Sequence, residues 1–184
     1  RPGHGRGAGL AGGLRPKCEV TGALLLGLDL GTTYCKAGLF ALDGEPVAIA
    51  ARPAPVQRDG EGRVWMDGEA LWRTVVDTLG SVVKGHEAAI HSLGIASMAE
   101  SGLLLDHVTG APRSDLILWS DTTAAAYAET LAQNSDAVER FIRTGMRISY
   151  KLPIARLLAF KAARPEQLDA AVWVSTAGYI AFRL

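Results

Sequence analysis

Residues 24–40 read Leu-Leu-Leu-Gly-Leu-Asp-Leu-Gly-Thr-Thr-Tyr-Cys-Lys-Ala-Gly-Leu-Phe. Two apolar runs flank a short polar segment, and this pattern predicts a strand, a tight turn and a returning strand. Side chains alternate between the two faces of a strand, so the alternate leucines share one face and Asp29 lies on the other. Gly31 then permits a sharp turn, because glycine adopts backbone angles that other residues resist.

The polar segment of this hairpin contains the residue types that hold a nucleoside triphosphate. Thr32 and Thr33 offer hydroxyls and adjacent backbone N–H groups, which suit phosphate oxygens. Lys36 adds a positive charge, and the carboxylate of Asp29 suits Mg²⁺, usually through water. We therefore predict that Asp29, Gly31, Thr32, Thr33 and Lys36 bind ATP and that Asp29 is the acid associated with Mg²⁺. The alternative is an ordinary β-hairpin with an acid beside its turn.

The composition bounds the class of protein. The chain has 184 residues, 48% of them hydrophobic, which fits one packed domain with or without a tail. Its formal net charge of +0 gives no electrostatic reason to expect a nucleic-acid or membrane partner. Cys18 and Cys35 are too few for a disulfide framework, so we expect a reducing, cytoplasmic location. No apolar run approaches the roughly 20 residues that span a bilayer.

Residues 1–22 form a segment rich in glycine and arginine, which we expect to be a disordered arm. This arm lacks the continuous apolar region of a secretory signal. Its alternating glycines follow no strand, so they do not form a dinucleotide-binding fingerprint. The chain begins without Met and ends within a helical pattern. We therefore expect residues 23–184 to be one domain of a longer protein, incomplete at its C-terminal end.

The remaining pattern alternates strands and helices. Asp43-Gly44 predicts a two-residue hairpin turn, and the proline and glycine residues of 52–63 predict a loop. Asp67 can cap a helix that ends near Lys84. The strand after that helix should run parallel to the first strand, because a helical crossover joins the two. Strands are expected at 23–30, 34–42, 47–51, 90–97, 103–106, 116–119 and 172–174, and helices at 67–84, 123–132, 135–143, 153–163 and 175–184.

Several short motifs stand in a fixed order along the chain. They are Asp29-Leu-Gly-Thr-Thr33, Trp65-x-Asp67, Gly94-Ile-Ala-Ser-Met-Ala-Glu-Ser-Gly102, Ile117-Leu-Trp119-Ser-Asp121, Thr144-Gly145 and Ala162-Ala-Arg-Pro165-Glu. As an ordered set they resemble the first part of an FGGY-family carbohydrate kinase, over residues 23–184.

The resemblance implies an α/β, actin-like (ribonuclease-H-like) fold in which three antiparallel strands are followed by parallel strands and helices. Two such domains flank a cleft that holds MgATP and a sugar. The implied reaction is ATP-dependent phosphorylation of a hydroxyl of a sugar, polyol or sugar acid. A homodimer of the full-length protein is compatible with the resemblance.

The resemblance also assigns roles to individual residues of the phosphate hairpin and of the turn near residue 100. Asp29 matches the Mg²⁺-associated acid, Thr32 and Thr33 match the residues that contact the β- and γ-phosphates, and Lys36 matches a basic residue that reaches them. Glu100 falls where glycerol kinases have the Glu of Gln-Arg-Glu, which implies hydrogen bonds to substrate hydroxyls. Ala99, which precedes it, can contribute only shape.

Three further residues are implied to bind substrate. Trp119 matches a tryptophan that packs on the substrate, Asp121 follows it in the Trp-x-Asp motif, and Tyr150 corresponds, within one residue, to a substrate-contacting tyrosine. Each has a plainer alternative: Trp119 could belong to the core, Asp121 could be a helix N-cap, and Tyr150 could form only local hydrogen bonds. Glu100 could likewise be a solvated loop residue.

Two departures from the family pattern leave the substrate open. Thr123 stands where the family commonly has Arg, and Met98-Ala99-Glu100 replaces both the Gln-Arg-Glu and the Gln-Met-His triplet. The family's catalytic base is expected beyond Leu184, so we predict that this chain is inactive alone. The alternatives are a regulator that binds sugar or nucleotide without catalysis, and an ATPase of the actin or chaperone type. The Trp119-Ser-Asp121 segment favours the sugar kinase.

Overall fold

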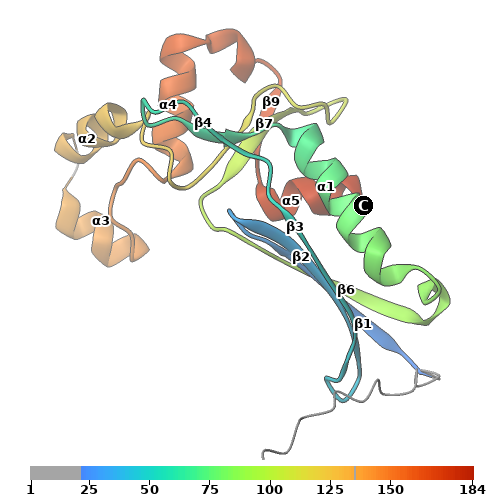
Figure 1. Cartoon of the computed structure of the whole chain (residues 1–184). Helices are drawn as coiled ribbons and strands as arrows, with labels where there is room; N and C mark the ends of the chain where they lie inside the picture. The colour runs from blue at the N-terminus through green and yellow to red at the C-terminus, as the bar shows by residue number, and fades with distance from the viewer. Residues whose placement is uncertain (1–21, 135) are drawn as a thin grey trace, which may run out of the picture.

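The computed structural model describes residues 22–134 and 136–184, and Figure 1 shows their arrangement. The predicted arm, residues 1–22, lies outside the described residues apart from Gly22. None of the helices in the described part of the chain has the length and apolar character that crossing a membrane requires.

The first sheet has four strands in the order β3-β2-β1-β6. Strands β1 (Leu24–Leu30), β2 (Tyr34–Ala41) and β3 (Pro46–Pro53) pair antiparallel, as predicted. Strand β6 (Ile90–Ser97) pairs parallel with β1, which confirms the predicted crossover. Sheet and crossover together place the ends of β1 and β6 side by side.

One face of this sheet forms the main core. The alternating leucines of β1 are buried, whereas Leu25 and Asp29 on the other face are exposed. Helix α1 (Gly68–Val83) packs against β2 and β3. Asp67 caps this helix as predicted, since its Oδ1 accepts a hydrogen bond from the Ala70 N–H at 2.7 Å. The buried residues of α1 recur at helical spacing and comprise Gly68, Leu71, Val75, Thr78, Leu79 and Val82.

The turn between β2 and β3 spans residues 42–44, so the predicted two-residue turn is wrong. The N–H of Gly44 donates to the carbonyl of Ala41 at 3.0 Å, and the N–H of Ala41 donates to that of Glu45 at 2.9 Å. Gly44 has a φ of 90°, in the left-handed region that glycine tolerates. A three-residue turn of this kind ends in a glycine bulge, which the dipeptide Asp43-Gly44 alone does not distinguish from a shorter turn.

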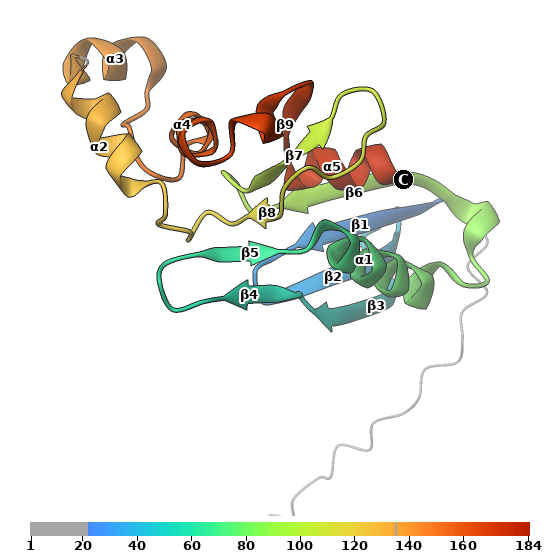
Figure 2. The same cartoon turned by 90° about the horizontal axis from the view of Figure 1, so that it is seen from above.

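The second sheet has five strands in the order β4-β5-β8-β7-β9, and all its pairs are antiparallel (Figure 2). Its strands are β4 (Val56–Arg58), β5 (Val64–Met66), β7 (Gly102–Asp106), β8 (Leu116–Ile117) and β9 (Ala171–Ser175). The parallel pairing is thus limited, among the described strands, to β1 with β6.

Strand β4 lies inside the predicted loop 52–63, so that prediction is wrong over Val56–Arg58. A tight turn joins β4 to β5. In this turn Gly60 and Gly62 have φ values of 83° and 95°, and the Oδ1 of Asp59 accepts hydrogen bonds from two backbone N–H groups further along the turn. The loop-forming residues therefore make a hairpin whose strands are too short to show an alternating pattern.

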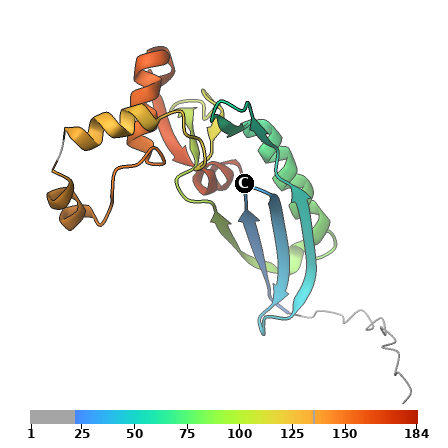
Figure 3. The ribbon, with the colours of Figure 1, turned by 60° about the vertical axis from the view of Figure 1, so that its left-hand side comes forward.

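The remaining helices are α2 (Ala125–Gln133), α3 (Ala137–Thr144), α4 (Pro153–Ala163) and α5 (Thr176–Arg183), with 3-10 turns η1 (Glu87–Ala89) and η2 (Pro165–Leu168). Asp136 caps α3 by accepting hydrogen bonds from two N–H groups of its first turn. Helix α5 contacts β6, β7 and β9, and its Tyr179 and Ile180 join the main core. Helices α2 and α3 project from the body of the protein, and α2 packs against α4 around a small core of alanines (Figure 3).

Candidate functional site

The turn between β1 and β2 is held by one backbone hydrogen bond. The N–H of Gly31 donates to the carbonyl of Tyr34 at 3.0 Å. A Cβ at position 31 would lie 2.9 Å from that carbonyl oxygen, so a larger residue would push the turn open. Gly31 is not one of the described residues that have a positive φ. The expected reason for this glycine, an unusual backbone angle, is therefore wrong: close approach to a carbonyl makes it necessary.

The two threonines of this turn are accessible. Thr32 is half-buried and Thr33 is exposed. The carbonyl of Thr33 accepts a hydrogen bond from the N–H of Ala54 at 2.9 Å, which fixes the turn against the end of β3. The turn is thus anchored at its base, while Thr33 is exposed and Thr32 remains partly accessible.

Asp29 and Lys36 are direct partners across the β1–β2 ladder. The Nζ of Lys36 lies 4.0 Å from the Oδ2 of Asp29, and their side chains are 57% and 54% exposed. An exposed ion pair of this kind contributes only about 0–1 kcal/mol to stability. Both charges can therefore turn to a ligand at little energetic cost.

The metal ligands available here fit a magnesium ion that is bound mainly by phosphate oxygens and water. Mg²⁺ usually keeps several waters and binds one or two carboxylates together with substrate phosphates. Asp29 supplies one accessible carboxylate beside the β1–β2 turn, whose threonines are predicted to bind phosphate. Within residues 22–134 and 136–184, no group of three or more His, Cys, Asp or Glu residues is arranged to hold a metal ion without other ligands.

The segment containing Glu100 starts beside this hairpin. Leu30 pairs with Ser97 at the ends of β1 and β6, and the N–H of Met98 donates to the carbonyl of Leu30 at 3.2 Å. Ala99 is exposed and Glu100 is half-buried. Glu100 has a φ of 56°, which is uncommon for a residue other than glycine. Strained residues of this type cluster at functional sites.

Ser101 links the Glu100 turn to two other elements, and sequence reasoning missed it. Its side chain is buried, and its Oγ accepts a hydrogen bond from the N–H of Trp119 at 2.9 Å and donates to the carbonyl of Ala99 at 3.3 Å. The carbonyl of Ser101 accepts from the N–H of Thr176 at 3.0 Å, at the start of α5. The motif gave no signal for this role, because Trp119 and Thr176 lie far away in the sequence.

Trp119 is 40% exposed, so the structure does not place its ring fully in the core. The Nζ of Lys151 lies 4.9 Å from the centre of the indole ring, within the range of a cation–π contact. The predicted strand 116–119 ends at Ile117. The N–H of Leu118 still donates to the carbonyl of Val64, in register with β5, but the N–H of Val64 donates to the Oδ2 of Asp121 and the carbonyl of Leu118 accepts from Arg156. The return hydrogen bond of this pair is therefore missing, and the ladder does not continue.

Asp121 is 1% exposed, and its carboxylate is bonded to the chain itself. Its Oδ2 accepts a hydrogen bond from the N–H of Val64 at 2.8 Å, and its Oδ1 accepts from the N–H of Thr123 at 3.0 Å. The hydroxyl of Thr123 donates to the same oxygen. Asp121 thereby joins β5 to the segment before α2, although the N-cap position of α2 is Ala124.

Arg156 holds the segment before Trp119 from the other side, and sequence reasoning missed it as well. Its side chain is 2% exposed. Its Nη1 and Nη2 donate to the carbonyls of Ile117 and Leu118 at 2.9 and 2.7 Å. Its Nε donates to the carbonyl of Tyr150 at 3.5 Å, so it also fixes the loop before α4. The available signal was a single arginine within an otherwise apolar stretch of helix.

Three of the predicted substrate residues lie close enough to Arg156 to interact with its positive charge. Burial lowers the pKa of Arg156, and the nearby Asp121, Glu100 and Tyr150 oppose this fall. Tyr150 itself is half-buried and packs against the small core between α2 and α4. One buried guanidinium therefore connects the segments that carry Glu100, Trp119 and Tyr150.

Solved structures place this arrangement in the class of actin-like ATPase folds. The structure of a xylulose kinase from Rhodospirillum rubrum superimposes with a TM-score of 0.81 at 25% sequence identity, covering 88% of this chain and 34% of that one. The structure of Plasmodium falciparum glycerol kinase with ADP superimposes with a TM-score of 0.80 at 17% identity, covering 88% of this chain and 34% of that one, and this likeness shows the fold alone.

The chain belongs to the FGGY family of carbohydrate kinases, since the model of the family's N-terminal domain matches residues 24–184. An apulose kinase from Pectobacterium atrosepticum is 31% identical over 143 residues, which cover 77% of this chain and 29% of that protein. A glycerol kinase from Acaryochloris marina is 34% identical over 125 residues, covering 66% of this chain and 25% of that protein. This chain thus spans less than a third of the length of these two relatives.

Proposed function

We propose that this chain is the N-terminal domain of a longer ATP-dependent carbohydrate kinase, which transfers a phosphoryl group to a hydroxyl of a sugar, polyol or sugar acid. The observation that carries this proposal is the junction between β1 and β6. There the Met98–Leu30 hydrogen bond joins the turn that contains Glu100 to the hairpin that contains Asp29. Ligands of open α/β sheets bind outside the carboxyl ends of parallel strands, where both acids lie.

In this proposal the β1–β2 turn holds the polyphosphate. Thr32 and Thr33 donate to phosphate oxygens, Lys36 offsets their charge, and Gly31 keeps the turn closed. Asp29 would hold Mg²⁺, which neutralises phosphate charge when it is bound. Phosphoryl transfer depends mainly on positioning and on charge stabilisation, and both tasks suit these groups.

The sugar would bind beside Glu100 and Trp119. Glu100 accepts hydrogen bonds from sugar hydroxyls, because a buried hydroxyl left unpaired costs about 1–3 kcal/mol. Trp119 covers the C–H face of the sugar, and Lys151 moves off its ring when a substrate stacks there. Ala99 leaves space beside the sugar, and Tyr150 closes its edge.

Asp121 contributes through the backbone it holds. Its hydrogen bonds to Val64 and Thr123 fix the segment that follows Trp119. The family resemblance puts the catalytic base after Leu184. We therefore expect the isolated chain to bind ligands without turning them over, and activity is tested in the complete protein.

The test is sugar-dependent ADP release by the complete protein, measured with a panel of glycerol, xylulose, apulose and gluconate. Asp29→Asn should lower kcat by about a hundredfold, the scale for losing one charge-stabilising group. Asp43→Asn is the matched control, because Asp43 lies in the turn between β2 and β3, where its carboxylate accepts, among the described residues, only from the N–H of Glu45. Glu100→Gln should raise KM for the sugar more than KM for ATP.

Two results would contradict the kinase. A non-catalytic regulator would bind a sugar from the panel without any ADP release. An ATPase of the actin or chaperone type would release ADP without sugar, and Glu100→Gln would leave its rate unchanged.

A further inference from the structure

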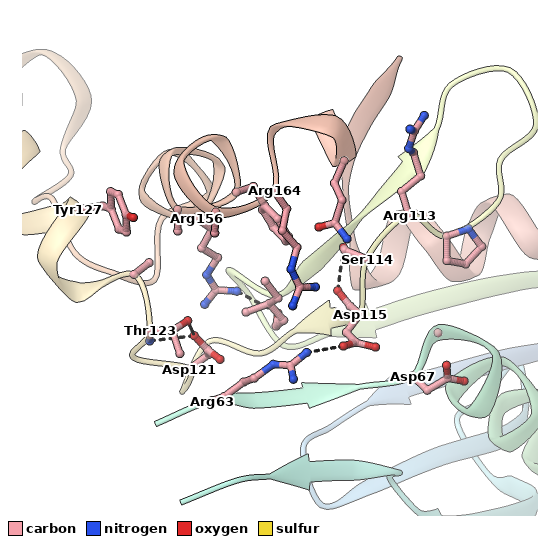
Figure 4. Close-up of a pocket in the computed structure, with 18 of the residues that line it drawn as sticks. Arg63, Asp67, Arg113, Ser114, Asp115, Asp121, Thr123, Tyr127, Arg156 and Arg164 are labelled. Atoms are coloured by element: carbon pink, nitrogen blue, oxygen red, sulfur yellow. Dashed lines mark hydrogen bonds and ion pairs between the residues drawn. The ribbon is translucent and has the colours of Figure 1, made fainter. Parts of the chain in front are cut away.

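A cavity of about 680 Å³ lies between α2, α4 and η2 on one side and the start of α1, Arg63 and the segment that leads into β8 on the other (Figure 4). Its volume is typical of a small-molecule site. Residues of the β1–β2 hairpin do not line it, and neither do Glu100, Trp119 or Tyr150. Of the predicted substrate residues Asp121 does line it, with a carboxylate that is bonded to the chain itself. Arg156 lines the cavity and also bonds the carbonyls before Trp119, so it forms part of the wall between this cavity and the proposed sugar site.

Most charges around the cavity are already balanced. Arg63 forms an ion pair with Asp115, with Nη2 and Oδ2 2.5 Å apart. The Nη1 of Arg113 lies 3.1 Å from the Oδ2 of Asp106, and Arg183 donates a hydrogen bond to the carboxylate of Glu69. In each of these three pairs the positive and negative charges cancel.

Among the described arginines that line the cavity, Arg164 is the one whose side chain has neither an acidic partner nor a backbone carbonyl as partner. It extends from the C-terminal end of α4, and Figure 4 shows its guanidinium directed into the cavity. Among the described residues, no hydrogen bond, ion pair or ring contact engages its side chain. Asp67, which also lines the cavity, accepts its hydrogen bond from the first turn of α1. The unpaired guanidinium is suited to a carboxylate or phosphate, which it can bind through two parallel hydrogen bonds.

Gln167 supplies a second, independent signal. Its Oε1 is buried and has no hydrogen-bond partner within the described residues. A buried acceptor without a donor is unfavourable, and Gln167 lines the cavity, so rotation of its amide toward the cavity would let this oxygen accept a hydrogen bond from a ligand. The N–H of Gln167 donates to the carbonyl of Arg164 at 3.0 Å, so the two residues belong to the same turn. A ligand that meets both needs carries an anionic group and a hydroxyl.

The walls of the cavity fit the carbon skeleton of such a ligand. Tyr127 projects from α2 toward α4, and Phe160 and two alanines of α4 line the same space. We propose that this cavity binds a small hydroxylated anion, a polyol or sugar that carries a phosphate or a carboxylate. Arg164 binds the anionic group, Gln167 accepts a hydrogen bond from a hydroxyl, and the site is separate from the proposed sugar site.

The test is a calorimetric titration of the complete protein, in the absence of ATP, with glycerol 3-phosphate and with gluconate. The first probe carries a phosphate and the second a carboxylate, so the two titrations distinguish the anionic groups. Glycerol is the neutral comparator and should not bind at this site. Arg164→Gln should weaken binding of the preferred probe by about tenfold to a hundredfold, the scale of a hydrogen bond to a charged group.

Three further variants make the result specific. Gln167→Leu should also weaken binding, because the hydroxyl loses its acceptor. Lys161→Gln removes the same charge from an exposed position of α4 outside the cavity lining and should leave the Kd unchanged. Glu100→Gln should leave the Kd unchanged as well, because Glu100 belongs to the other site. Arg164 is exposed, so thermal unfolding of its variant should match that of the parent.

Two outcomes would overturn the proposal. One is that neither probe binds at millimolar concentration. The other is that Glu100→Gln abolishes binding while Arg164→Gln does not, which would place the probe in the proposed sugar site. The readout is binding without turnover, so a failure of the proposed kinase activity leaves this test unaffected.

Discussion

The Oγ of Ser101 accepts a hydrogen bond from the backbone N–H of Trp119 at a distance of 2.9 Å. The two residues are far apart in the sequence, and this bond joins the turn after β6 to the segment after β8. The position of the exposed indole ring relative to Glu100 therefore depends on this buried hydroxyl as well as on Arg156, which holds the preceding residues.

Replacing Ser101 by Ala should destabilise the protein by about 1–3 kcal/mol, because the N–H of Trp119 loses its partner in a buried place. In the complete protein the same change should raise KM for the sugar more than KM for ATP. Denaturant unfolding and steady-state kinetics measure the two effects. Ser92→Ala, at an exposed position of β6, is the control and should change stability by less than about 0.5 kcal/mol. Equal destabilisation by both substitutions would contradict the role of Ser101.

Replacing Arg156 by Met should lower the free energy of unfolding by about 3 kcal/mol. Methionine fills part of the space but leaves the carbonyls of Ile117 and Leu118 without their charged donors. Urea unfolding provides the measurement. Arg143→Met is the control, since Arg143 is exposed and forms only a surface pair with Glu139, worth about 0.3–0.5 kcal/mol. A loss of the same small size at both positions would show that the buried guanidinium does not hold this segment.

The contact between Glu69 and Arg183 predicts a specific acid sensitivity. The hydrogen bond from Arg183 holds the pKa of Glu69 below its usual value of 4.5. Because the folded pKa is lowered, the pair stabilises the protein above pH 4.5, and its contribution disappears as the pH falls through the folded pKa. The Glu69 side chain is 50% exposed, so the contribution is at most about 1 kcal/mol.

Thermal unfolding of the Glu69→Gln variant between pH 7 and pH 3 measures this contribution. The variant should be less stable than the parent at pH 7, and the difference should shrink as the pH falls below 4.5. Glu129→Gln, at an exposed position of α2, is the control for removing one carboxylate. If the parent and the Glu69→Gln variant lose stability in parallel from pH 7 to pH 3, the pair does not contribute.

Cys35 should resist thiol reagents while the protein is folded. Burial raises the pKa of its thiol to about 11, and the negative charge of Asp29 adds to this rise. At pH 8 the reactive thiolate is therefore scarce as well as covered. In a Cys18→Ser background, a chromogenic disulfide reagent should react slowly with the native protein. After denaturation it should release one equivalent of chromophore per chain, from reaction with Cys35. A Ser92→Cys variant in that background supplies an exposed thiol for comparison, and native Cys35 reacting as fast as that thiol would contradict the prediction.

The features that the sequence predicts correctly are those decided by neighbouring residues. The alternation of buried leucines defines β1, and the side chain of Asp67 defines the start of α1. The parallel pairing of β1 and β6 follows from the helix between them, because such crossovers rarely permit another arrangement. In each case a local pattern of a few residues carries enough information.

The features that the sequence does not predict depend on contacts between distant segments. Strand β4 and the early end of β8 depend on which backbone groups find partners in other strands. The same is true of Ser101 and Arg156, which bond backbone groups of β8 and of the segment after it that lie 18 and 38 to 39 residues away. The Trp119-Ser-Asp121 motif identifies the right segment but cannot show that the Asp121 carboxylate turns inward to the N–H of Val64.

The left-handed backbone at Glu100, with its φ of 56°, has a consequence for anyone who tries to evolve this protein. Glycine occupies that conformation without strain, so selection for heat tolerance alone favours its appearance at position 100. A library screened only for soluble, thermostable clones would thus lose the Glu100 side chain that is proposed to bind the sugar, although the selected clones would be more stable. Screening for turnover in parallel is the safeguard that this geometry demands.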